Sequence, residues 1–335
     1  MHDTLTLGLR HHQQGRLDEA DRLYQSVLAQ QPGDPDALHL VGVVALQKGD
    51  YRRAADQIGQ AIARNPGSAA YHANLGEALR SLGQLDRAAD CCRTALRLEP
   101  RSPEAANCLG LVLLAQGKKE EAVAQFREAL RLKPDYAIAC SNLGNALRLS
   151  GDIDGAVAYF RRATEIDPEL AGAHSNLGQL LLDRHQPHEA LTHLRTAVRL
   201  CPTLAEARNN LGNALRETGR LAEARQSYAE ALRINPTLAM TYNNMGQALQ
   251  EENSLDDARA WYQRAIQLDP KSARIHTNRA SLLAVQDKDD EALAGYGPTW
   301  PRPATTSATP CARWASWPRR GSPTPRRCGS VLPWR

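Results

Sequence analysis

The chain has 335 residues, 42% of them hydrophobic, and a formal net charge of +4 at pH 7. The final 39 residues hold 7 arginines and no acidic residue, which leaves 34 basic against 37 acidic residues before them, a net charge of −3. The basic character therefore gives no support to nucleic-acid binding by residues 1–296. No run approaches the ~18 apolar residues that span a bilayer, and the start of the chain does not resemble a secretory signal, so a cytoplasmic protein is expected.

Three residue types recur at a fixed step of 34 residues, which indicates an internal repeat. The prolines are Pro32, Pro66, Pro100, Pro134, Pro168, Pro202, Pro236 and Pro270. The glycines are Gly8, Gly42, Gly76, Gly110, Gly144, Gly178, Gly212 and Gly246. The alanines are Ala20, Ala54, Ala88, Ala122, Ala156, Ala190, Ala224, Ala258 and Ala292. The repeats are 1–34, 35–68, 69–102, 103–136, 137–170, 171–204, 205–238, 239–272 and a partial ninth at 273–296, which together form one predicted array.

Each repeat is predicted to hold two amphipathic helices, as Leu143 and Leu147 on a first helix and Ala156 and Phe160 on a second illustrate. Between the helices a glycine recurs where a left-handed backbone can end the first one. These glycines are Gly15, Gly49, Gly83, Gly117, Gly151 and Gly219. Asn253 is an acceptable substitute, whereas His185 is the exception. The proline after each second helix cannot donate the next helical hydrogen bond and is expected to end that helix.

The period, the repeated Gly, Ala and Pro, and a mostly bulky second-helix position such as Phe126 or Tyr228 resemble the tetratricopeptide repeat family. The aromatic residue usual four positions before the glycine is replaced in most repeats, for example by His72 and Cys140. The resemblance implies an all-α fold, a right-handed α-solenoid (superhelix) of helix-turn-helix units with a concave inner face. It covers eight full repeats and a partial ninth.

Asparagine recurs two residues before the repeated glycine, interrupted by Leu40 and Cys108, and further amides stand one residue after the glycine and three before it. In tetratricopeptide arrays these positions face the groove. We therefore predict a peptide-binding groove lined by Asn74, Asn142, Asn145, Asn176, Gln179, Asn209, Asn210, Asn213, Asn243, Asn244, Gln247 and Asn278. An amide offers both a donor and an acceptor, as a peptide backbone does. The alternative is that these side chains are structural and bond the neighbouring repeat, and both roles are compatible.

None of these twelve positions is basic, so the sequence does not predict a clamp for a partner's terminal carboxylate. Arg80, Arg148 and Arg216 recur one helical turn after the glycine in alternate repeats. Two interpretations stay open for these arginines. They form a basic edge to the groove, or they are exposed helix residues paired with local acids.

The sequence Asn-Leu-Gly-Asn-Ala-Leu at 142–147 and 210–215 is similar to repeats of the O-linked N-acetylglucosamine transferase family and its bacterial relatives, in which an asparagine ladder holds the protein substrate. The resemblance reaches only the substrate-recognition half, because no transferase-like sequence follows Tyr296. We predict a nonenzymatic protein–protein interaction scaffold that binds an extended peptide or a partner helix. The alternative is the truncated recognition region of such a glycosyltransferase, and a glycosyltransferase-like reading frame past codon 296 would decide for it.

No catalytic, cofactor or metal site is predicted, because no nucleophile has a base at a diagnostic spacing and no glycine-rich loop could cradle a phosphate. His185, His188 and His193 are close in sequence, but their spacing around Pro187 does not place all three on one helical stripe. The seven cysteines include no Cys-x-x-Cys pair and are expected to be reduced thiols.

The tail from Gly297 to Arg335 interrupts the expected second helix of repeat nine and contains 8 of the 19 prolines and 4 of the 5 tryptophans. One interpretation is a disordered extension, since such a composition cannot bury enough apolar surface to fold. A second is an arm that binds membrane surfaces or nucleic acid through Arg and Trp. The third, which we favour, is the product of a shifted reading frame in a GC-rich gene.

Overall fold

A computed structural model describes residues 2–285, and the chain divides into two compact units, unit 1 (Met1–Ile234) and unit 2 (Asn235–Arg335). Unit 1 contains α1 (His2–Gln13), α2 (Leu17–Gln30), α3 (Pro35–Gln47), α4 (Tyr51–Arg64), α5 (Ala69–Ser81), α6 (Leu85–Leu98), α7 (Pro103–Ala115), α8 (Lys119–Leu132), α9 (Ala137–Leu149), α10 (Ile153–Ile166), α11 (Ala171–Asp183), α12 (Pro187–Leu200), α13 (Ala205–Glu217) and α14 (Leu221–Ile234). Unit 2 contains α15 (Ala239–Glu251), α16 (Leu255–Leu268) and α17 (Ala273–Val285).

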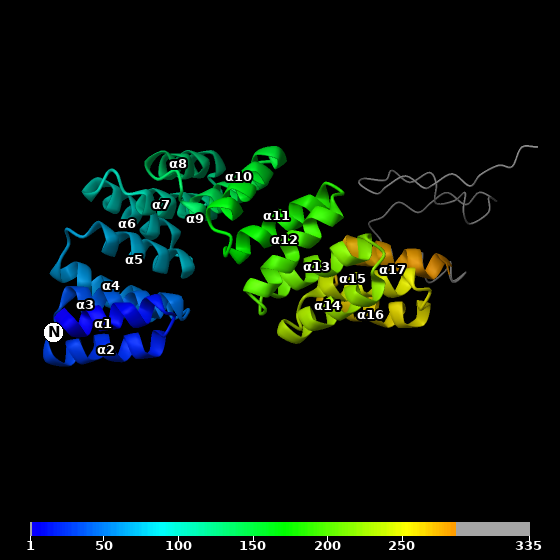
Figure 1. Cartoon of the computed structure of the whole chain (residues 1–335), viewed down its shortest axis with the longest axis horizontal. Coiled ribbons are helices and arrows are strands. Elements are labelled where there is room, and N and C mark those ends of the chain that lie inside the picture. The colour runs from blue at the N-terminus through cyan, green and yellow to red at the C-terminus, as the bar shows by residue number, and fades with distance from the viewer. Residues whose placement is uncertain (1, 286–335) are drawn as a thin grey trace, which may run out of the picture. The chain divides into compact units, whose positions relative to one another are not determined.

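The described residues form 17 α-helices and no strand, and the helices follow one another in pairs (Figure 1). From α4 onward every helix begins 34 residues after the corresponding helix of the preceding pair. The predicted all-α fold of tandem helix-turn-helix units is therefore confirmed. Tail residues 297–335 and the second helix expected in the partial ninth repeat lie outside the described residues.

Local signals set where several helices begin. The Asp34, Asp50 and Asp152 carboxylates each accept a hydrogen bond from the backbone N–H three residues later, at the start of α3, α4 and α10. Such caps satisfy donors that have no partner within the helix. Proline lies in the first turn of α3, α7 and α12, where its missing N–H costs nothing.

The turn inside each pair has the left-handed backbone that the glycine spacing predicts. All six predicted turn glycines have positive φ, from 72° at Gly15 to 88° at Gly151. Asn253 takes the same conformation with φ 62°, which confirms it as a substitute. His185 does so as well, with φ 57°, so the exception in sequence keeps the same turn geometry. A side chain is disfavoured in this region of backbone space, but a short turn between packed helices requires it.

The repeated glycine of each first helix allows the second helix to approach closely. A Cβ atom placed on Gly110 would lie 2.6 Å from Cε1 of Phe126, and one on Gly246 would lie 2.8 Å from Cε1 of Tyr262. Both aromatic side chains are fully buried. The bulky second-helix residue thus fills the space that the glycine leaves, and this contact forms the core of each pair.

Successive pairs within unit 1 stack in a regular way. Each second helix packs on the first helix of the following pair, as α6 does on α7 and α8 on α9. First helices also contact the next first helix, as in α5 with α7 and α11 with α13. In unit 2 the same contacts join α16 to α17 and α15 to α17. The first helices of neighbouring repeats therefore lie close enough for their side chains to meet.

Candidate functional site

The twelve predicted groove residues all lie on first helices, namely α5, α9, α11, α13, α15 and α17. An α-helix turns about 100° per residue, so the position two before the repeated glycine lies about 160° around the helix from it. Because the glycine faces its own second helix, this asparagine position faces away from that helix. We call the twelve residues the amide row, and the side of the first helices that carries them the amide face.

Three members of the amide row bond to the preceding repeat. The side-chain nitrogen of Asn142 donates to Oδ1 of Asn107 at 2.8 Å, and that of Asn278 donates to Oδ1 of Asn243 at 2.8 Å. The amide nitrogen of Asn74 lies 2.8 Å from Nε2 of His39 and donates to it. Each bond joins the position two before the repeated glycine, which is Ala280 in the ninth repeat, to the position three before the glycine of the preceding repeat. These bonds support the structural role that the sequence left open.

The length of the partner side chain decides where this bond forms. Asn107, the partner of Asn142, lies 35 residues before it. The residues at the same distance before Asn176 and Asn210 are serines, Ser141 and Ser175. The serine hydroxyl is attached directly to Cβ, so it extends less far from the backbone than the amide of asparagine. Asn176 accordingly makes no hydrogen bond to any described residue, and its side chain is exposed.

Other members of the row bond within their own repeat. Gln179 donates to Asp183 at 3.0 Å, and Asn213 accepts from the Tyr228 hydroxyl at 2.9 Å. Asn209 donates to Oδ1 of Asn210 at 3.2 Å. These residues are partly exposed and remain within reach of a partner.

The residues of the amide row differ in how deeply they are buried. Asn243 and Asn244 are 0% and 2% exposed, and the side-chain nitrogen of Asn243 donates to Oδ1 of Asn244 at 3.4 Å. A partner could contact these two side chains only by displacing what covers them. Gln247 and Asn278, by contrast, line a pocket in unit 2. The accessible part of the row in unit 1 lies on α5, α9, α11 and α13.

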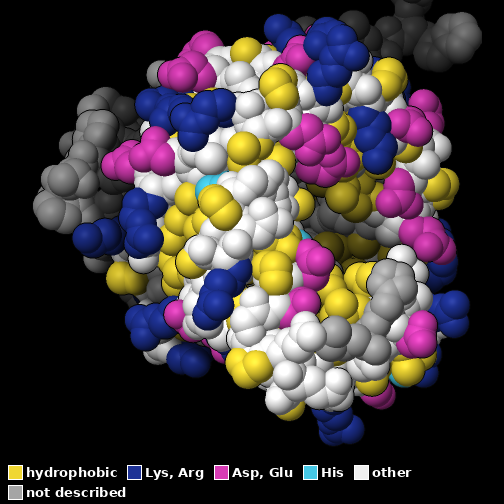
Figure 2. Space-filling model, turned by 90° about the vertical axis from the view of Figure 1, so that its left-hand side faces the viewer, with side chains coloured by type: hydrophobic (Ala, Val, Ile, Leu, Met, Phe, Trp, Pro, Cys, Tyr) yellow, Lys and Arg dark blue, Asp and Glu magenta, His cyan; other side chains and the backbone are white. Residues whose placement is uncertain are grey.

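Two of the three arginines that recur one turn after the glycine have partners within their own helix. Arg80 forms an ion pair with Glu77 at 2.6 Å, which is the pairing with a local acid that the sequence allowed. Arg148 donates to Oδ1 of Asn145 at 2.9 Å. On the side of the molecule drawn in Figure 2, basic and acidic side chains lie among one another.

Comparison with protein families decides the class of this chain. A family model described as "Cilia and flagella-associated protein 70 C-terminal domain" matches residues 1–215, and two models described as "Tetratricopeptide repeat" match residues 203–271 and 243–301. The chain is a tetratricopeptide repeat protein. Over residues 1–215, which are more than half of it, it belongs to the family of that C-terminal domain. No curated protein sequence matches it.

Solved structures share the tetratricopeptide fold. A chain from "Crystal structure of APC/C hetero-tetramer Cut9-Hcn1" is 15% identical with a TM-score of 0.69, and the alignment covers 80% of this chain and 52% of that one. The pilF protein of Pseudomonas aeruginosa is 20% identical with a TM-score of 0.58, covering 64% and 97%. A thermophilic tetratricopeptide protein of Thermus thermophilus is 27% identical with a TM-score of 0.51, covering 54% and 98%. This chain thus spans about half the length of the first of these.

Tetratricopeptide repeat domains are in general protein–protein interaction modules, and the matching family models describe no catalytic domain. Among the described residues, no group of three or more His, Cys, Asp or Glu is arranged to hold a metal ion. His193 instead pairs with His174, with 3.0 Å between their Nδ1 atoms. Burial lowers the pKa of both imidazoles. Within residues 2–285, no helix combines the length and apolar composition that crossing a bilayer requires.

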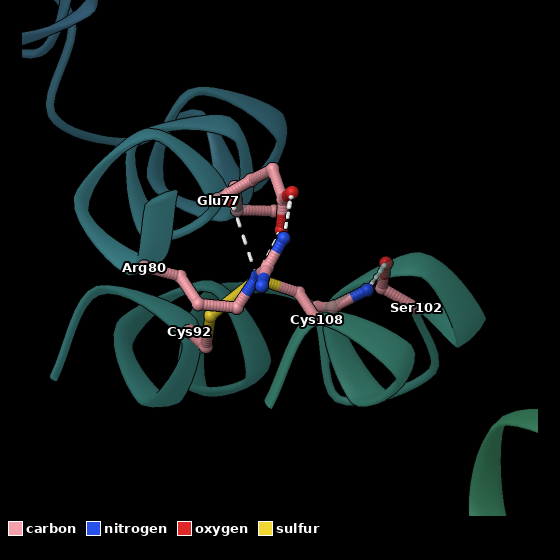
Figure 3. Close-up of a disulfide and its surroundings, with 7 residues drawn as sticks. Glu77, Arg80, Cys92, Ser102 and Cys108 are labelled. Atoms are coloured by element: carbon pink, nitrogen blue, oxygen red, sulfur yellow. Dashed lines mark hydrogen bonds and ion pairs between the residues drawn. A yellow bond between two sulfur atoms is a disulfide. The ribbon is translucent and has the colours of Figure 1, made fainter. Parts of the chain in front are cut away.

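The expectation of reduced thiols is wrong at one pair, because Cys92 and Cys108 form a disulfide (Figure 3). Cys92 occupies the bulky position on α6, and Cys108 occupies the asparagine position on α7. Packing of these two helices brings their Cα atoms to 6.2 Å, within the range a disulfide requires. Cys91, Cys140 and Cys201 are free, and Cys311 and Cys328 lie outside the described residues.

One recurrent contact of this tetratricopeptide array was missed in the sequence. The position four before the glycine, where the family usually has an aromatic residue, often carries a donor to the carbonyl of the proline six residues earlier. These contacts are His72 to Pro66, His174 to Pro168, Arg208 to Pro202, Tyr242 to Pro236 and His276 to Pro270, at 2.9 to 3.3 Å. The sequence signal that could have predicted these contacts is the constant spacing of six residues between each proline and the donor side chain.

A second feature that the sequence did not predict lies around the hydrogen bond between Asn74 and His39. The ring of His39 stacks on that of Tyr71 with 4.4 Å between centroids, and the Tyr71 hydroxyl donates to Asp36. Burial lowers the pKa of His39 to about 4, against the weaker opposing effect of Asp36. The imidazole is therefore neutral at pH 7, so its Nε2 can accept the hydrogen bond from Asn74.

Proposed function

We propose that this tetratricopeptide repeat protein is a nonenzymatic scaffold that binds an extended protein segment along the amide face of unit 1. The binding residues would be Asn145, Asn176, Gln179, Asn210 and Asn213 on α9, α11 and α13. The observation that carries the proposal is the exposure of Asn176, whose amide has no hydrogen-bond partner among the described residues. Contacts between α9 and α11 and between α11 and α13 keep these amides close together.

An extended segment presents a backbone N–H and C=O at each residue, and an amide side chain can pair with either group. Each such bond contributes about 0.5 to 1.5 kcal/mol net, so affinity would depend on several of them in a row. Asn142 fits this picture as well. Its bond to Asn107 uses the amide nitrogen, which leaves the carbonyl oxygen for a partner. A structural and a binding role therefore coexist in one side chain.

Cytoplasmic localisation remains a prediction. The family name for residues 1–215 points instead to cilia and flagella, and microscopy of the tagged full chain would distinguish the two settings. The recognition region of a glycosyltransferase remains the alternative function. The sequence shared by 142–147 and 210–215 favours it, and the reading frame past codon 296 tests it.

The groove is tested by replacing its most accessible amides. Unstructured peptides of about 15 residues are selected on the full chain, and fluorescence anisotropy then measures their affinity. The double substitution Asn176→Ala with Asn210→Ala should weaken binding about thirtyfold, because two bonds of about 1 kcal/mol each are lost. Its thermal midpoint should not change, since neither residue bonds a neighbouring repeat.

The control is Gln60→Ala, which removes an exposed amide from a second helix, where it bonds only Asp56 in its own helix. This variant should bind the selected peptides as the unmodified chain does. Equal affinity of the double variant and the unmodified chain would exclude the amide face of unit 1 as the binding site.

A further inference from the structure

On α9 the two amides of the amide face lie between two exposed aliphatic side chains. Ile138 and Leu149 are 49% and 42% exposed, and Asn142 and Asn145 stand between them in the sequence. Steps of four, three and four residues keep these four side chains within about 60° of one side of the helix. The two aliphatic residues are about 16 Å apart along the helix axis. The amide face of α9 is therefore bordered by apolar surface at both edges.

The same edges are acidic in the next two repeats. The position of Ile138 is taken by Gly172 on α11 and by Glu206 on α13, and all three are the second residue of their helix. The position of Leu149 is taken by Asp183 on α11. Gly172 has no side chain, so nothing from its position stands between the other two. The amide face of unit 1 thus changes from apolar borders on α9 to acidic ones on α11 and α13.

Glu206 is the acidic residue of this face that a partner can reach. It is exposed and makes no hydrogen bond or ion pair with any described residue. Arg208 on the same helix is already paired with Glu230 on α14. Arg216 is half-buried and lies about 15 Å further along the helix axis. Asp183 accepts a hydrogen bond within its own helix, so it adds charge to the face but has a partner already.

The repeat fixes the spacing between the apolar and the acidic border. Ile138 and Glu206 occupy equivalent positions two repeats apart, and contacts join α9 to α11 and α11 to α13. Packed helices lie about 8 to 10 Å apart, so about 16 to 20 Å separates α9 from α13. An extended chain advances about 3.3 Å per residue and covers this distance in about five or six residues.

We propose that the protein segment bound on the amide face of unit 1 carries a large aliphatic residue and, about five or six positions away, a lysine or an arginine. Ile138 contacts the aliphatic residue, which removes apolar surface of both from water. Glu206 pairs with the basic residue and disfavours acidic partners. The amides hold the backbone, and these two border residues select the sequence. The inference rests on the proposed function, because it names the class of segment that the same face would take.

The sequence preference is tested directly by selection. A randomised library of peptides of about 15 residues is selected on the full chain, and the enriched peptides are sequenced. We expect an aliphatic and a basic residue to recur at a separation of about five or six positions. Enrichment of acidic peptides, or of peptides without this pair, would overturn the proposal.

Variants assign each preference to its border residue, with affinity measured by fluorescence anisotropy on one enriched peptide. Ile138→Ser should weaken binding about tenfold, because the aliphatic contact is lost. Glu206→Gln keeps the shape and removes the charge, so it should weaken binding about threefold at low salt and less at high salt. Against a peptide whose basic residue is replaced by serine, Glu206→Gln should have no effect. Equal losses against both peptides would overturn the pairing.

Matched controls lie on second helices, away from the amide face. Leu98→Ser in α6 removes an aliphatic side chain that is 42% exposed, as Leu149 is. Glu120→Gln changes an exposed acid that is the second residue of α8, as Glu206 is of α13. Both controls should bind the peptide as the unmodified chain does. If they weaken binding as much as the border variants do, the proposal is wrong.

The two proposals fail separately. Peptides that respond to the double substitution of Asn176 and Asn210, but not to Ile138→Ser and Glu206→Gln, would refute the sequence preference and leave the groove standing. Peptides that ignore the double substitution would refute the groove itself, whatever their sequence.

Discussion

The first helices present two faces that follow different rules. On the face toward the second helix, a glycine meets a second-helix side chain in every full repeat, as Gly110 meets Phe126. On the amide face the same residue type has different surroundings in different repeats, since Asn176 is exposed and Asn244 is buried. The packing face is thus uniform along the array, whereas the amide face varies with its neighbours. Variation of this kind is where a scaffold can acquire specificity.

The largest expected effect is the difference in stability between two Gly→Ala substitutions, one on the packing face and one away from it. Gly110→Ala places a Cβ atom within 3.0 Å of three ring atoms of Phe126, and this overpacking should cost about 2 kcal/mol in the free energy of unfolding. Gly59→Ala in α4 meets no atom within 4 Å and should gain about 1 kcal/mol through helix propensity. Denaturant unfolding followed by circular dichroism measures both. Equal effects at the two positions would show that the packing face does not depend on the missing Cβ.

The packing face could be predicted from the sequence because its cause lies within a single repeat. The period of 34 residues fixes which side chain meets the glycine, and turn geometry follows from one left-handed residue. Even His185 obeys this rule, because the two packed helices on either side impose the turn. The two helices of each repeat, core positions such as Phe160 and the turn at Asn253 therefore follow from residue spacing alone.

The sequence predicts where the amide face lies, but it does not predict which of its side chains are hydrogen-bonded. Whether an asparagine is bonded depends on a side chain 35 residues earlier, so Asn107 pairs with Asn142 while Ser141 leaves Asn176 without a partner among the described residues. The sequence contains both residues of each pair. Recognising the pair, however, requires knowing that packing of neighbouring first helices brings together side chains 35 residues apart. The Cys92–Cys108 disulfide was missed for the same reason, because it joins two repeats.

A second comparison lies within the amide face itself. Asn243 is fully buried, accepts from Asn278 and donates to Asn244. Asn243→Ala removes one hydrogen bond from each of these two side chains and should lower the free energy of unfolding by about 2 kcal/mol. Asn176→Ala, at an exposed position without such bonds, should change it by less than about 0.5 kcal/mol. Similar losses in the two variants, measured by denaturant unfolding, would contradict the division of the row by burial.

The smallest expected effect comes from adding the bond that Asn176 lacks. Ser141→Asn places an amide where Asn107 stands one repeat earlier, so it should accept from Asn176 and raise the free energy of unfolding by about 1 kcal/mol. The gain should vanish when Asn176→Ala is added, because a double-mutant cycle isolates the pairwise contribution. Peptide affinity should fall at the same time, since the amide nitrogen of Asn176 would be occupied. If stability rises without any loss of affinity, Asn176 contacts the partner through its carbonyl oxygen, as we infer for Asn142. An unchanged stability would show that partner length does not decide where the row is bonded.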